Sequence, residues 1–323
     1  TPIALMGGLN SAAKEMIIIK NLAVLELISR SKDIIFDKTG TLTLGVPQVS
    51  QVLANSDLSE DDLAASAAAL EKNSLHPIAK AVVEYAERKN LNIERAVDIK
   101  ETIGEGISGV VNNKRYEITK GQSQEKMSVD VLLEGKIIGS IFFEDKIKKN
   151  TKAIITKLIS DRYSLTIFTG DKESRVKELL DELELDLDYK AECKPEEKLE
   201  GIAALQSKGR ITTMIGDGIN DAPALAKADV GIVFSNEEQT ASSEAANVVI
   251  LGGDMKKVLK TMTISKKTVE IAKQSIFFGI GISIGLMVFA SFGFIVPIVG
   301  AILQEVIDVA VILNSLRTTK IKV

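Results

Sequence analysis

One heptad in this chain has the residue types and the order needed to accept a phosphoryl group. It is DKTGTLT at residues 37–43, and it directly follows the apolar residues 34–36. A carboxylate at the end of a strand can attack phosphorus as a nucleophile. Lys38 and the hydroxyls of the heptad can stabilise the charge on the transferred group. We therefore predict that Asp37 is a nucleophile that becomes phosphorylated.

Thr39 is informative because of the function that it lacks. Many aspartate-nucleophile phosphatases of this general fold carry a second aspartate two residues after the nucleophile, where it acts as a general acid and base. A threonine at this position cannot shuttle the proton, so an acyl phosphate on Asp37 would be hydrolysed slowly. A long-lived phosphoenzyme is of use to a pump and of none to a phosphatase.

Two further acidic motifs follow apolar runs in the same way. TGD at residues 169–171 follows the run 165–168, and GDG at residues 216–218 follows the run 212–215. Helical stretches lie between most of the apolar runs, and alternating strands and helices predict a doubly wound parallel sheet. Such sheets place their functional sites at the carboxyl ends of the strands. We therefore expect the three motifs to meet at one edge.

Residues 48–135 differ in character from this pattern and predict an inserted α+β domain. Two helical segments are followed by strand-like pieces with glycine and asparagine turns. The insert holds the only histidine of the chain, His76, just before a proline that can start a helix. A lone histidine is more often structural than functional. GEGISG at 104–109 is not a dinucleotide-binding turn, because strand-like sequence follows it; its glycines would let ATP approach the backbone closely.

The segment 275–316 is almost entirely apolar and is about twice as long as the ~20 residues that span a bilayer. Gly293 and Pro297 interrupt it, so we expect two membrane helices at about 275–291 and 297–316. Lysines and arginines flank the pair on both sides, which places both ends in the cytoplasm. The alternative is a buried helical hairpin of a soluble protein.

Glu305 and Asp308 are the only charged residues within this apolar pair. At a spacing of three residues they share a helix face, and carboxylates inside a membrane are costly and usually functional. Oxygen ligands favour a divalent cation over soft Cu⁺. We predict that the two residues bind a transported ion; the alternative is a polar lock between helices.

Bulk properties exclude some classes of protein. The chain has 323 residues and a net charge of −4, so no overall basic field attracts nucleic acid. Cys193 is the single cysteine and cannot form an internal disulfide, which agrees with a reducing cytosolic environment. The chain begins with TPIALMGG rather than with methionine, and we interpret it as part of a longer protein.

The heptad at 37–43 resembles the phosphorylation motif of P-type ATPases, and the rest of the chain agrees with that family in order and spacing. The resemblance implies a haloacid-dehalogenase-like phosphorylation domain in which TGD contacts the phosphate, a P-x-x-K element brings in a lysine, and GDGIND at 216–221 is a hinge. It implies that Mg²⁺ is held by Asp37, the carbonyl of Thr39 and Asp217. The implied catalytic residues are Asp37, Lys38, Thr39, Thr169, Gly170, Asp171, Lys198, Asn220 and Asp221.

The insert resembles that of the heavy-metal-transporting branch of this family. Glu71, Ser74 and His76 form the pattern E-x-x-S-x-H-P, which is similar to the H-P element of that branch. The resemblance implies that ATP binds to Glu71, His76, Gly104 and Gly106.

The first residues of the chain are similar to the stretch that follows the intramembrane Cys-Pro-Cys-type element of the same branch. The resemblance implies that this element, the earlier membrane helices and the actuator domain lie in a missing N-terminal half, so that the chain alone would not transport ions. The Tyr-Asn and Met-Ser-Ser elements of the branch's copper pumps do not occur in the apolar pair.

We expect ATP-driven transport of a heavy-metal cation, divalent by its ligands, through an aspartyl phosphate, with ATP and Mg²⁺ as cofactors and no nucleic-acid partner. The protein would lie in the cell membrane with its catalytic domains in the cytoplasm. The alternatives are a soluble aspartate-nucleophile phosphatase and a membrane module that only binds nucleotide. The expected domains are a membrane exit and stalk helix (1–30), a phosphorylation domain (31–47 and 136–255), a nucleotide-binding domain (48–135), a second stalk helix (256–274) and two transmembrane helices (275–317).

Overall fold

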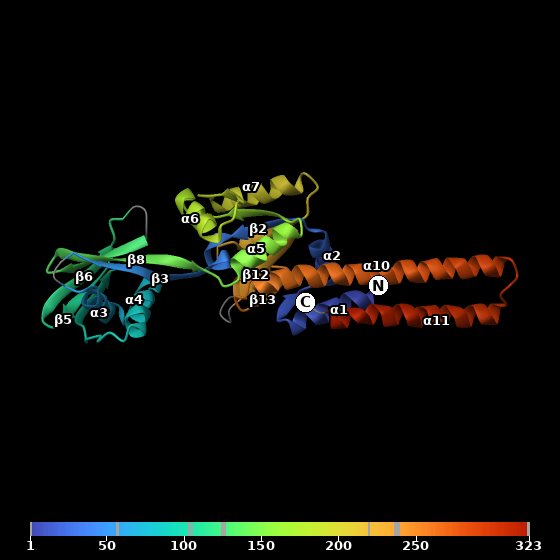
Figure 1. The fold of residues 1–323 in the computed structure, drawn as a ribbon, viewed down its shortest axis with the longest axis horizontal. Helices are drawn as coiled ribbons and strands as arrows, with labels where there is room; N and C mark the ends of the chain where they lie inside the picture. Colours follow the sequence, from blue (N-terminus) through green and yellow to red (C-terminus); the bar gives the residue numbers. More distant parts are fainter. Residues whose placement is uncertain are drawn as a thin grey trace. The chain divides into compact units, whose positions relative to one another are not determined.

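The computed structural model describes residues 2–55, 58–102, 104, 106–123, 127–218, 220–235 and 240–321. It divides into two compact units (Figure 1). The major unit comprises Thr1–Leu42 with Ile147–Val323, and the insert comprises Thr43–Lys146.

A seven-stranded sheet forms the centre of the major unit, in the order β1-β13-β12-β11-β2-β9-β10. β1 pairs antiparallel with β13, and the other neighbours pair in parallel. The predicted doubly wound parallel sheet is therefore confirmed, with an antiparallel edge strand added. The strands are β1 (Ile17–Ile19), β2 (Asp33–Asp37), β9 (Ser164–Phe168), β10 (Asp188–Lys190), β11 (Thr212–Gly216), β12 (Val230–Ser235) and β13 (Val248–Leu251).

Helices cover both faces of this sheet, as β2 illustrates. Ile34 and Phe36 pack into one apolar cluster with α2, α5, α6 and the start of α10, whereas Ile35 packs into a second cluster with α7 and α8. Successive side chains of a strand point to opposite faces, so a strand buried on both sides is a continuous apolar run. The helices are α2 (Leu22–Arg30), α5 (Thr151–Ser160), α6 (Glu173–Leu183), α7 (Pro195–Gln206), α8 (Ala222–Lys227) and α9 (Thr240–Ala245).

Residues 1–30, expected to hold a membrane exit and a stalk helix, contain three elements. They form α1 (Pro2–Lys14), the edge strand β1 and the helix α2. Asn21 separates the last two, since its side chain accepts a hydrogen bond from the backbone of Val24 and caps α2. The apolar face of α2 belongs to the core of the sheet. The helical spacing of this segment thus reflects packing on the sheet.

The insert is an α+β unit, as predicted. A six-stranded sheet in the order β3-β8-β7-β6-β5-β4 shares one apolar core with two helices. His76 caps the second helix and Pro77 is its first residue. The elements are β3 (Thr43–Ala54), α3 (Glu60–Glu71), α4 (Pro77–Arg88), β4 (Val97–Thr102), β5 (Gly106–Val111), β6 (Lys114–Lys120), β7 (Met127–Leu133) and β8 (Lys136–Ile147).

The compact insert is longer at both ends than the expected range 48–135. β3 begins at Thr43, and β8 lies between β3 and β7 in the sheet of the insert rather than in the major sheet. Ile138, Ile141 and Phe143 of β8 are buried in the core of the insert. The apolar run at 136–147 fits a strand of either sheet, and only its pairing with β7 assigns it to the insert.

The C-terminal segment forms two long helices, α10 (Lys256–Ser291) and α11 (Pro297–Ser315), followed by the 3-10 helix η2 (Leu316–Lys320). The expected second stalk helix and first membrane helix are one continuous helix, α10. The two helices run side by side (Figure 1). Gly293 adopts a positive φ of 76° after α10, and Pro297 begins α11, so both predicted interruptions lie in the turn.

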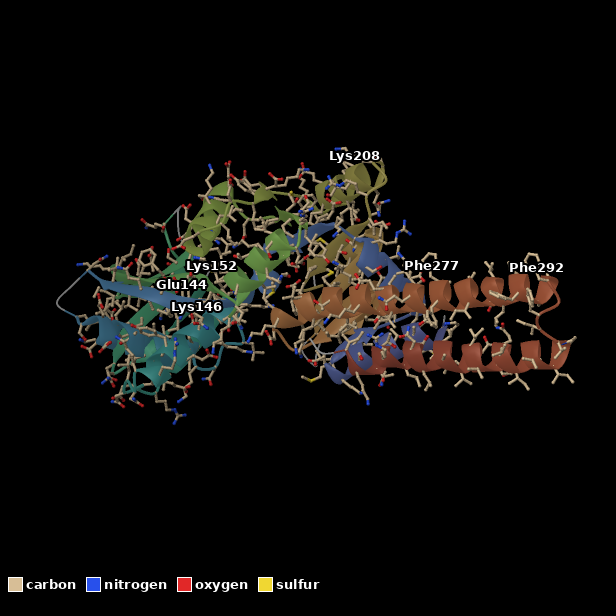
Figure 2. All side chains as sticks on the ribbon, turned by 45° about the vertical axis from the view of Figure 1, so that its right-hand side comes forward. Glu144, Lys146, Lys152, Lys208, Phe277 and Phe292 are labelled. Carbon is tan, nitrogen blue, oxygen red and sulfur yellow. The ribbon has the colours of Figure 1, made fainter. Side chains whose placement is uncertain are left out.

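Among the described residues, two helices are long and apolar enough to cross a membrane, judged by length and composition. Many of their apolar side chains point outward, as Phe277 of α10 illustrates in Figure 2, and Phe292 does so in the turn that follows α10. Phe277 is 75% exposed and Phe292 is 72% exposed. A core helix of a soluble protein would bury such side chains. The structure therefore favours a membrane hairpin over the alternative of a buried soluble hairpin.

Candidate active site

Asp37, Lys198 and Asp221 form a buried cluster at the carboxyl end of β2. Lys198 lies in the first turn of α7, and its Nζ donates hydrogen bonds to Asp37 Oδ1 and to Asp221 Oδ1, both at 2.7 Å. The three residues are 6%, 9% and 2% exposed, in the order Asp37, Lys198, Asp221. One ammonium group thus faces two carboxylates in a site that excludes most water.

The pKa of the Asp37 carboxyl is raised to about 7, chiefly by burial and also by the carboxylates of Asp221 and Asp217, with the Lys198 ammonium opposing the increase. Burial alone would lower the pKa of Lys198, but the carboxylates of Asp37 and Asp221 raise it overall. Lys198 is therefore a cation at physiological pH. An additional cation beside Asp37 would favour the ionised carboxylate, which is the nucleophilic form.

The loop after β9 lies beside the loop after β2. The two strands are paired in parallel, with Asp37 opposite Phe168, so the residues that follow each strand are neighbours. Asp171 forms an ion pair with Lys38 at 2.5 Å, and it accepts a hydrogen bond from the hydroxyl of Thr39 at 3.4 Å. Its backbone N–H donates to the hydroxyl of Thr169 at 3.1 Å. Asp171 therefore orients both residues that follow the nucleophile.

Asp217 lies against the loop Lys38–Leu42 from the other side. Gly40 has a φ of +72°, and a Cβ built on it would lie 2.6 Å from Asp217 Oδ2. A glycine is required here both by the backbone conformation and by the close approach. The hydroxyl of Thr41 in the same loop is fully buried and, among the described residues, has no hydrogen-bond partner. An oxygen-rich edge with an unsatisfied donor fits a phosphoryl group and the hard oxygen ligands of Mg²⁺.

Most of the predicted catalytic residues lie in one cluster, and for Gly170 and Asn220 only their positions in the fold are described. Gly170 lies in the loop between Thr169 and Asp171, while Asn220 is exposed and lies just before α8. Ile219 of the predicted hinge motif lies outside the described residues. The structure brings together Asp37, Lys38, Thr39, Thr169, Asp171, Lys198 and Asp221, with Asp217 adjoining them through the glycine of the loop.

Two of the candidate nucleotide residues, Glu71 and His76, lie at and after the end of α3, next to residues that contact Glu101 of β4. Glu71 is buried at the end of α3, and Ser74 donates a hydrogen bond to Glu101 Oε1 at 2.9 Å. The backbone N–H of His76 donates to Ser74 Oγ, and His76 Nδ1 accepts a hydrogen bond from the N–H of Ile78. A neutral His76 therefore carries its hydrogen on Nε2, which leaves that nitrogen as a donor.

Two glycines follow β4 in the insert. Gly104 has a φ of +83° with open space where a side chain would be, and Gly106 has a φ of +141° and lies against the backbone of Ile118. Glu105, between them, lies outside the described residues. Burial and, to a lesser extent, the carboxylate of Glu101 raise the pKa of Glu71 to about 7. A ligand that donates hydrogen bonds would relieve this buried carboxyl.

Comparison with known proteins agrees with this geometry. Residues 32–229 match the haloacid dehalogenase-like hydrolase family. The solved catalytic domain of the CPx-ATPase CopB-B is 36% identical, with a TM-score of 0.66, over 77% of this chain and 96% of that domain. A zinc-transporting PIB-type ATPase in its E2.Pi state has a TM-score of 0.88 and 28% identity over 98% of this chain and 55% of its own. This chain belongs to the heavy-metal P-type ATPases.

Relatives in this family agree along nearly the whole chain. The copper-exporting P-type ATPase B of Archaeoglobus fulgidus is 34% identical over 97% of this chain and 48% of its own length. The cadmium-transporting ATPase of Staphylococcus aureus is 32% identical over 100% of this chain and 48% of its own length. The chain spans about half the length of the curated relatives it matches.

In the two apolar helices of this P-type ATPase chain, Asp308 is one of the two predicted ion ligands and is linked by hydrogen bonds to other polar side chains. Asp308 Oδ1 accepts a hydrogen bond from Gln304 Nε2 at 3.2 Å, and Gln304 Oε1 accepts one from Ser283 Oγ at 3.1 Å. Glu305 is exposed on α11. Within the described part of the chain, no three His, Cys, Asp or Glu residues come together as a metal site.

Several polar contacts of the site were not predicted from sequence. Glu101 and Gln304 stand next to predicted residues in space, but neither belongs to a motif at a diagnostic spacing. Glu101 meets Ser74 only through the fold of the insert. Gln304 lies one helical turn before Asp308 on α11, and the packing of α10 on α11 brings Ser283 to Gln304.

Proposed function

We propose that this chain is the catalytic part of a pump that transfers the γ-phosphoryl group of ATP to Asp37 and uses that step to move a heavy-metal cation across a membrane. The observation that carries the proposal is the bridge from Lys198 to Asp37 and Asp221 at the carboxyl end of β2. It places a nucleophile, a fixed cation and a supporting carboxylate within hydrogen-bond distance.

The residues of the chain have separate roles in this reaction. A carboxylate oxygen of Asp37 forms the new bond to the γ-phosphorus, and the bond from that phosphorus to the bridging oxygen of ADP breaks. Lys198 and Lys38 stabilise the negative charge of the transferred group, and Asp171 holds Lys38 in place. Most of the acceleration in such reactions comes from positioning and from electrostatic stabilisation of this kind.

Asp37, the carbonyl of Thr39 and Asp217 would hold Mg²⁺. The contact of Gly40 with Asp217 supports this assignment, because it brings the loop carrying that carbonyl against the second carboxylate. When bound, Mg²⁺ supplies positive charge that neutralises the phosphate oxygens.

The absence of an acid at Thr39 supports a stable aspartyl phosphate rather than fast turnover. The hydroxyl of Thr39 donates to Asp171, so this side chain helps to position the loop and provides no proton shuttle. A soluble phosphatase would need such a shuttle for rapid hydrolysis. The exposed apolar helices further favour the pump over that alternative.

ATP would bind through its base to the insert, at Glu71, His76, Gly104 and Gly106. The buried carboxyl of Glu71 can accept a hydrogen bond from an exocyclic amino group, and His76 Nε2 can donate one. The open space at Gly104 would admit a ligand close to the backbone. The solved CopB-B catalytic domain, whose structure concerns changes upon nucleotide binding, supports this assignment by analogy.

The transported ion is proposed from the membrane helices and the relatives. Relatives of this chain include proteins named for copper, zinc, cadmium and manganese, so their names do not choose a metal. We propose a divalent cation held in part by Asp308 and Glu305, because carboxylate and amide oxygens favour hard or borderline ions. The catalytic units would face the cytoplasm and the hairpin would lie in the cell membrane.

The nucleophile is tested with a full-length protein that contains this chain. Labelled ATP with Mg²⁺ should give one acid-stable, hydroxylamine-sensitive label, and Asp37→Asn should abolish it while ATP binding persists. The matched control is Asp188→Asn, an exposed aspartate of the same sheet, which should label normally. Full labelling of the Asp37→Asn protein would refute the assignment.

The metal is tested by ATPase activity of the same protein with Zn²⁺, Co²⁺, Mn²⁺, Ni²⁺, Cd²⁺ and Cu⁺. We expect stimulation by a divalent ion, reduced by Asp308→Asn or Glu305→Gln. Stimulation by Cu⁺ alone, unchanged in both variants, would overturn the metal class and the ligands.

A further inference from the structure

Lys148 is a buried lysine that belongs to none of the motifs described above. It follows β8 directly, at the point where the chain re-enters the major unit, and it is only 8% exposed. Its Nζ donates a hydrogen bond to the carbonyl of Gly40 at 2.5 Å and lies 4.1 Å from the centre of the Phe234 ring. Lysines are seldom buried to this degree without a partner that requires the charge.

A second contact ties the same residue to the same loop. The backbone N–H of Lys148 donates to the carbonyl of Leu42 at 2.9 Å, and the hydroxyl of Thr151 lies 3.4 Å from that carbonyl. Lys148 therefore holds two carbonyls, those of Gly40 and Leu42, within the loop Lys38–Leu42. Its side chain fixes the first and its backbone fixes the second.

The orientation of the peptide at Gly40 decides what the loop presents to the reaction. Gly40 adopts the left-handed conformation and lies against Asp217 with no room for a Cβ. The preceding residue, Thr39, donates to Asp171 and carries the carbonyl proposed as a ligand of Mg²⁺. The carbonyls of Thr39 and Gly40 belong to consecutive peptides that meet at the Gly40 Cα, so the hold of Lys148 on the second limits the conformations open to the first.

Packing alone does not explain a lysine at this position. A methionine has nearly the same length and would fill the space over the Phe234 ring without the cost of burying a charge. What methionine lacks is the ammonium group that donates to Gly40. The ammonium group also lies over the Phe234 ring, and its hydrogen bond to Gly40 is the contact that links it to the phosphorylation loop.

We propose that Lys148 is a positioning residue for phosphoryl transfer, whose ammonium group holds the carbonyl of Gly40 and so orients the loop between Asp37 and Asp217. The inference rests on the proposed function, in which Asp37 is the phosphorylated residue. Lys148 acts through the loop and does not contact the transferred group in this assignment.

The test compares three variants in the full chain. Lys148→Met removes the ammonium group and keeps the length, and Lys148→Arg keeps a cationic donor. Lys152→Met is the matched control, because Lys152 lies one turn further along on α5, is exposed and pairs with Glu184 (Figure 2).

The first measurement is the rate of phosphoenzyme formation from ATP. Because a small misplacement of reacting groups can cost up to about a hundredfold, Lys148→Met should lower the rate at saturating ATP by about tenfold or more. The ATP concentration at half-maximal rate should stay within about twofold, since the base binds to the insert. Lys148→Arg should restore most of the rate, and Lys152→Met should behave as wild type.

The second measurement does not depend on turnover. Mn²⁺ serves as the probe, titrated by electron paramagnetic resonance with beryllium fluoride as a phosphoryl mimic. Lys148→Met should weaken Mn²⁺ binding and Lys148→Arg should restore it, with melting temperatures close to wild type for both. Wild-type rate and Mn²⁺ affinity in Lys148→Met would overturn the proposal. So would equal losses in Lys148→Met and Lys148→Arg accompanied by a lower melting temperature, which would indicate a merely structural role.

Failure of the proposed function would look different from failure of this inference. If the wild-type chain takes no label from ATP while Asp37→Asn behaves identically, the proposed function fails. The Mn²⁺ titration of the Lys148 variants then still decides whether this lysine orients the loop.

Discussion

Replacing Glu71 by glutamine should make the insert more stable at neutral pH and remove a pH dependence of its stability. Burial, together with a smaller contribution from the neighbouring Glu101 carboxylate, raises the pKa of this carboxyl from 4.5 to about 7. A carboxyl with a raised pKa in the folded state opposes folding once it is ionised. Below pH 4.5 it is protonated in both states and costs nothing, and the cost grows until about pH 7 and is constant above that.

The size of the effect follows from the shift. A rise from 4.5 to about 7 corresponds to at most about 3 kcal/mol, and we expect about 2 kcal/mol because Glu71 retains some contact with water. The wild-type insert should therefore lose about 2 kcal/mol of unfolding free energy from this group between pH 4.5 and 7. Glu71→Gln should equal wild type at pH 4.5 and exceed it by about that amount at pH 7.5.

The assay is urea unfolding of the fragment Thr43–Lys146, followed by circular dichroism at several pH values. The fragment contains a complete sheet and its own apolar core, so two-state analysis is appropriate. Glu101→Gln should give a smaller gain than Glu71→Gln, because burial is the larger cause. Glu84→Gln, at an exposed position of α4, is the control and should follow wild type.

One result would refute the reasoning. If Glu71→Gln is no more stable than wild type at pH 7.5 and loses the same free energy between pH 4.5 and 7, then the carboxyl is not destabilised by its surroundings. The proposed nucleotide site implies a compensating cost, since the same variant should bind ATP more weakly. A gain in stability with a loss in binding is the pattern expected of a functional residue held in an unfavourable environment.

Three further predictions follow from the structure. The fragment Thr43–Lys146 should fold cooperatively, whereas a fragment of 47–135 should not. The shorter fragment lacks β8, whose three large core side chains together contribute about 5 kcal/mol, comparable with the stability of a small domain. A sharp unfolding transition for the shorter fragment would contradict this. Gly40→Ala should lower phosphoenzyme yield by about tenfold or more without changing ATP binding, because the added Cβ would meet the Asp217 carboxylate and would have to adopt the positive φ of this position. Normal labelling would show that the loop can adjust. Lys198→Ala should destabilise the major unit by about 3 kcal/mol at pH 7.5, because it leaves buried carboxylates unpaired. Adding Asp221→Asn to this variant should recover part of the lost stability. Hydrogen exchange of the β2 amides measures both changes, and unchanged protection in Lys198→Ala would argue against the bridge.

Much of the phosphorylation site could be predicted from sequence because its motifs are local. Asp37 and the TGD loop at 169–171 each end an apolar run that can only be a buried strand. Parallel strands in one sheet bring such ends to the same edge, so the motifs meet without any knowledge of the rest of the fold. The same holds for the membrane pair, whose length and lack of charge are properties of a continuous segment.

The division of strands between the two sheets could not be predicted in this way. The apolar run of β8 has the composition of a strand in either sheet, and its partner β7 is chosen by side chains that pack across the core of the insert. A membrane exit and a stalk helix were expected at residues 1–30, yet Ile17–Ile19 form the edge strand β1 because β13 offers an unpaired edge. The pairing of β1 with β13 joins segments more than two hundred residues apart in the sequence.

The sequence by itself therefore determined which residues can do the chemistry, because residue type, local order and the end of a strand can each be recognised from a few consecutive residues. Only the tertiary structure decided how those residues are held. The bridge from Lys198 to Asp37 and Asp221 joins three separate segments, and the contact of Lys148 with Gly40 joins positions on either side of the insert. Hydrogen bonds and ion pairs act over about 3 Å, so their partners are known only once packing has brought distant segments to that distance.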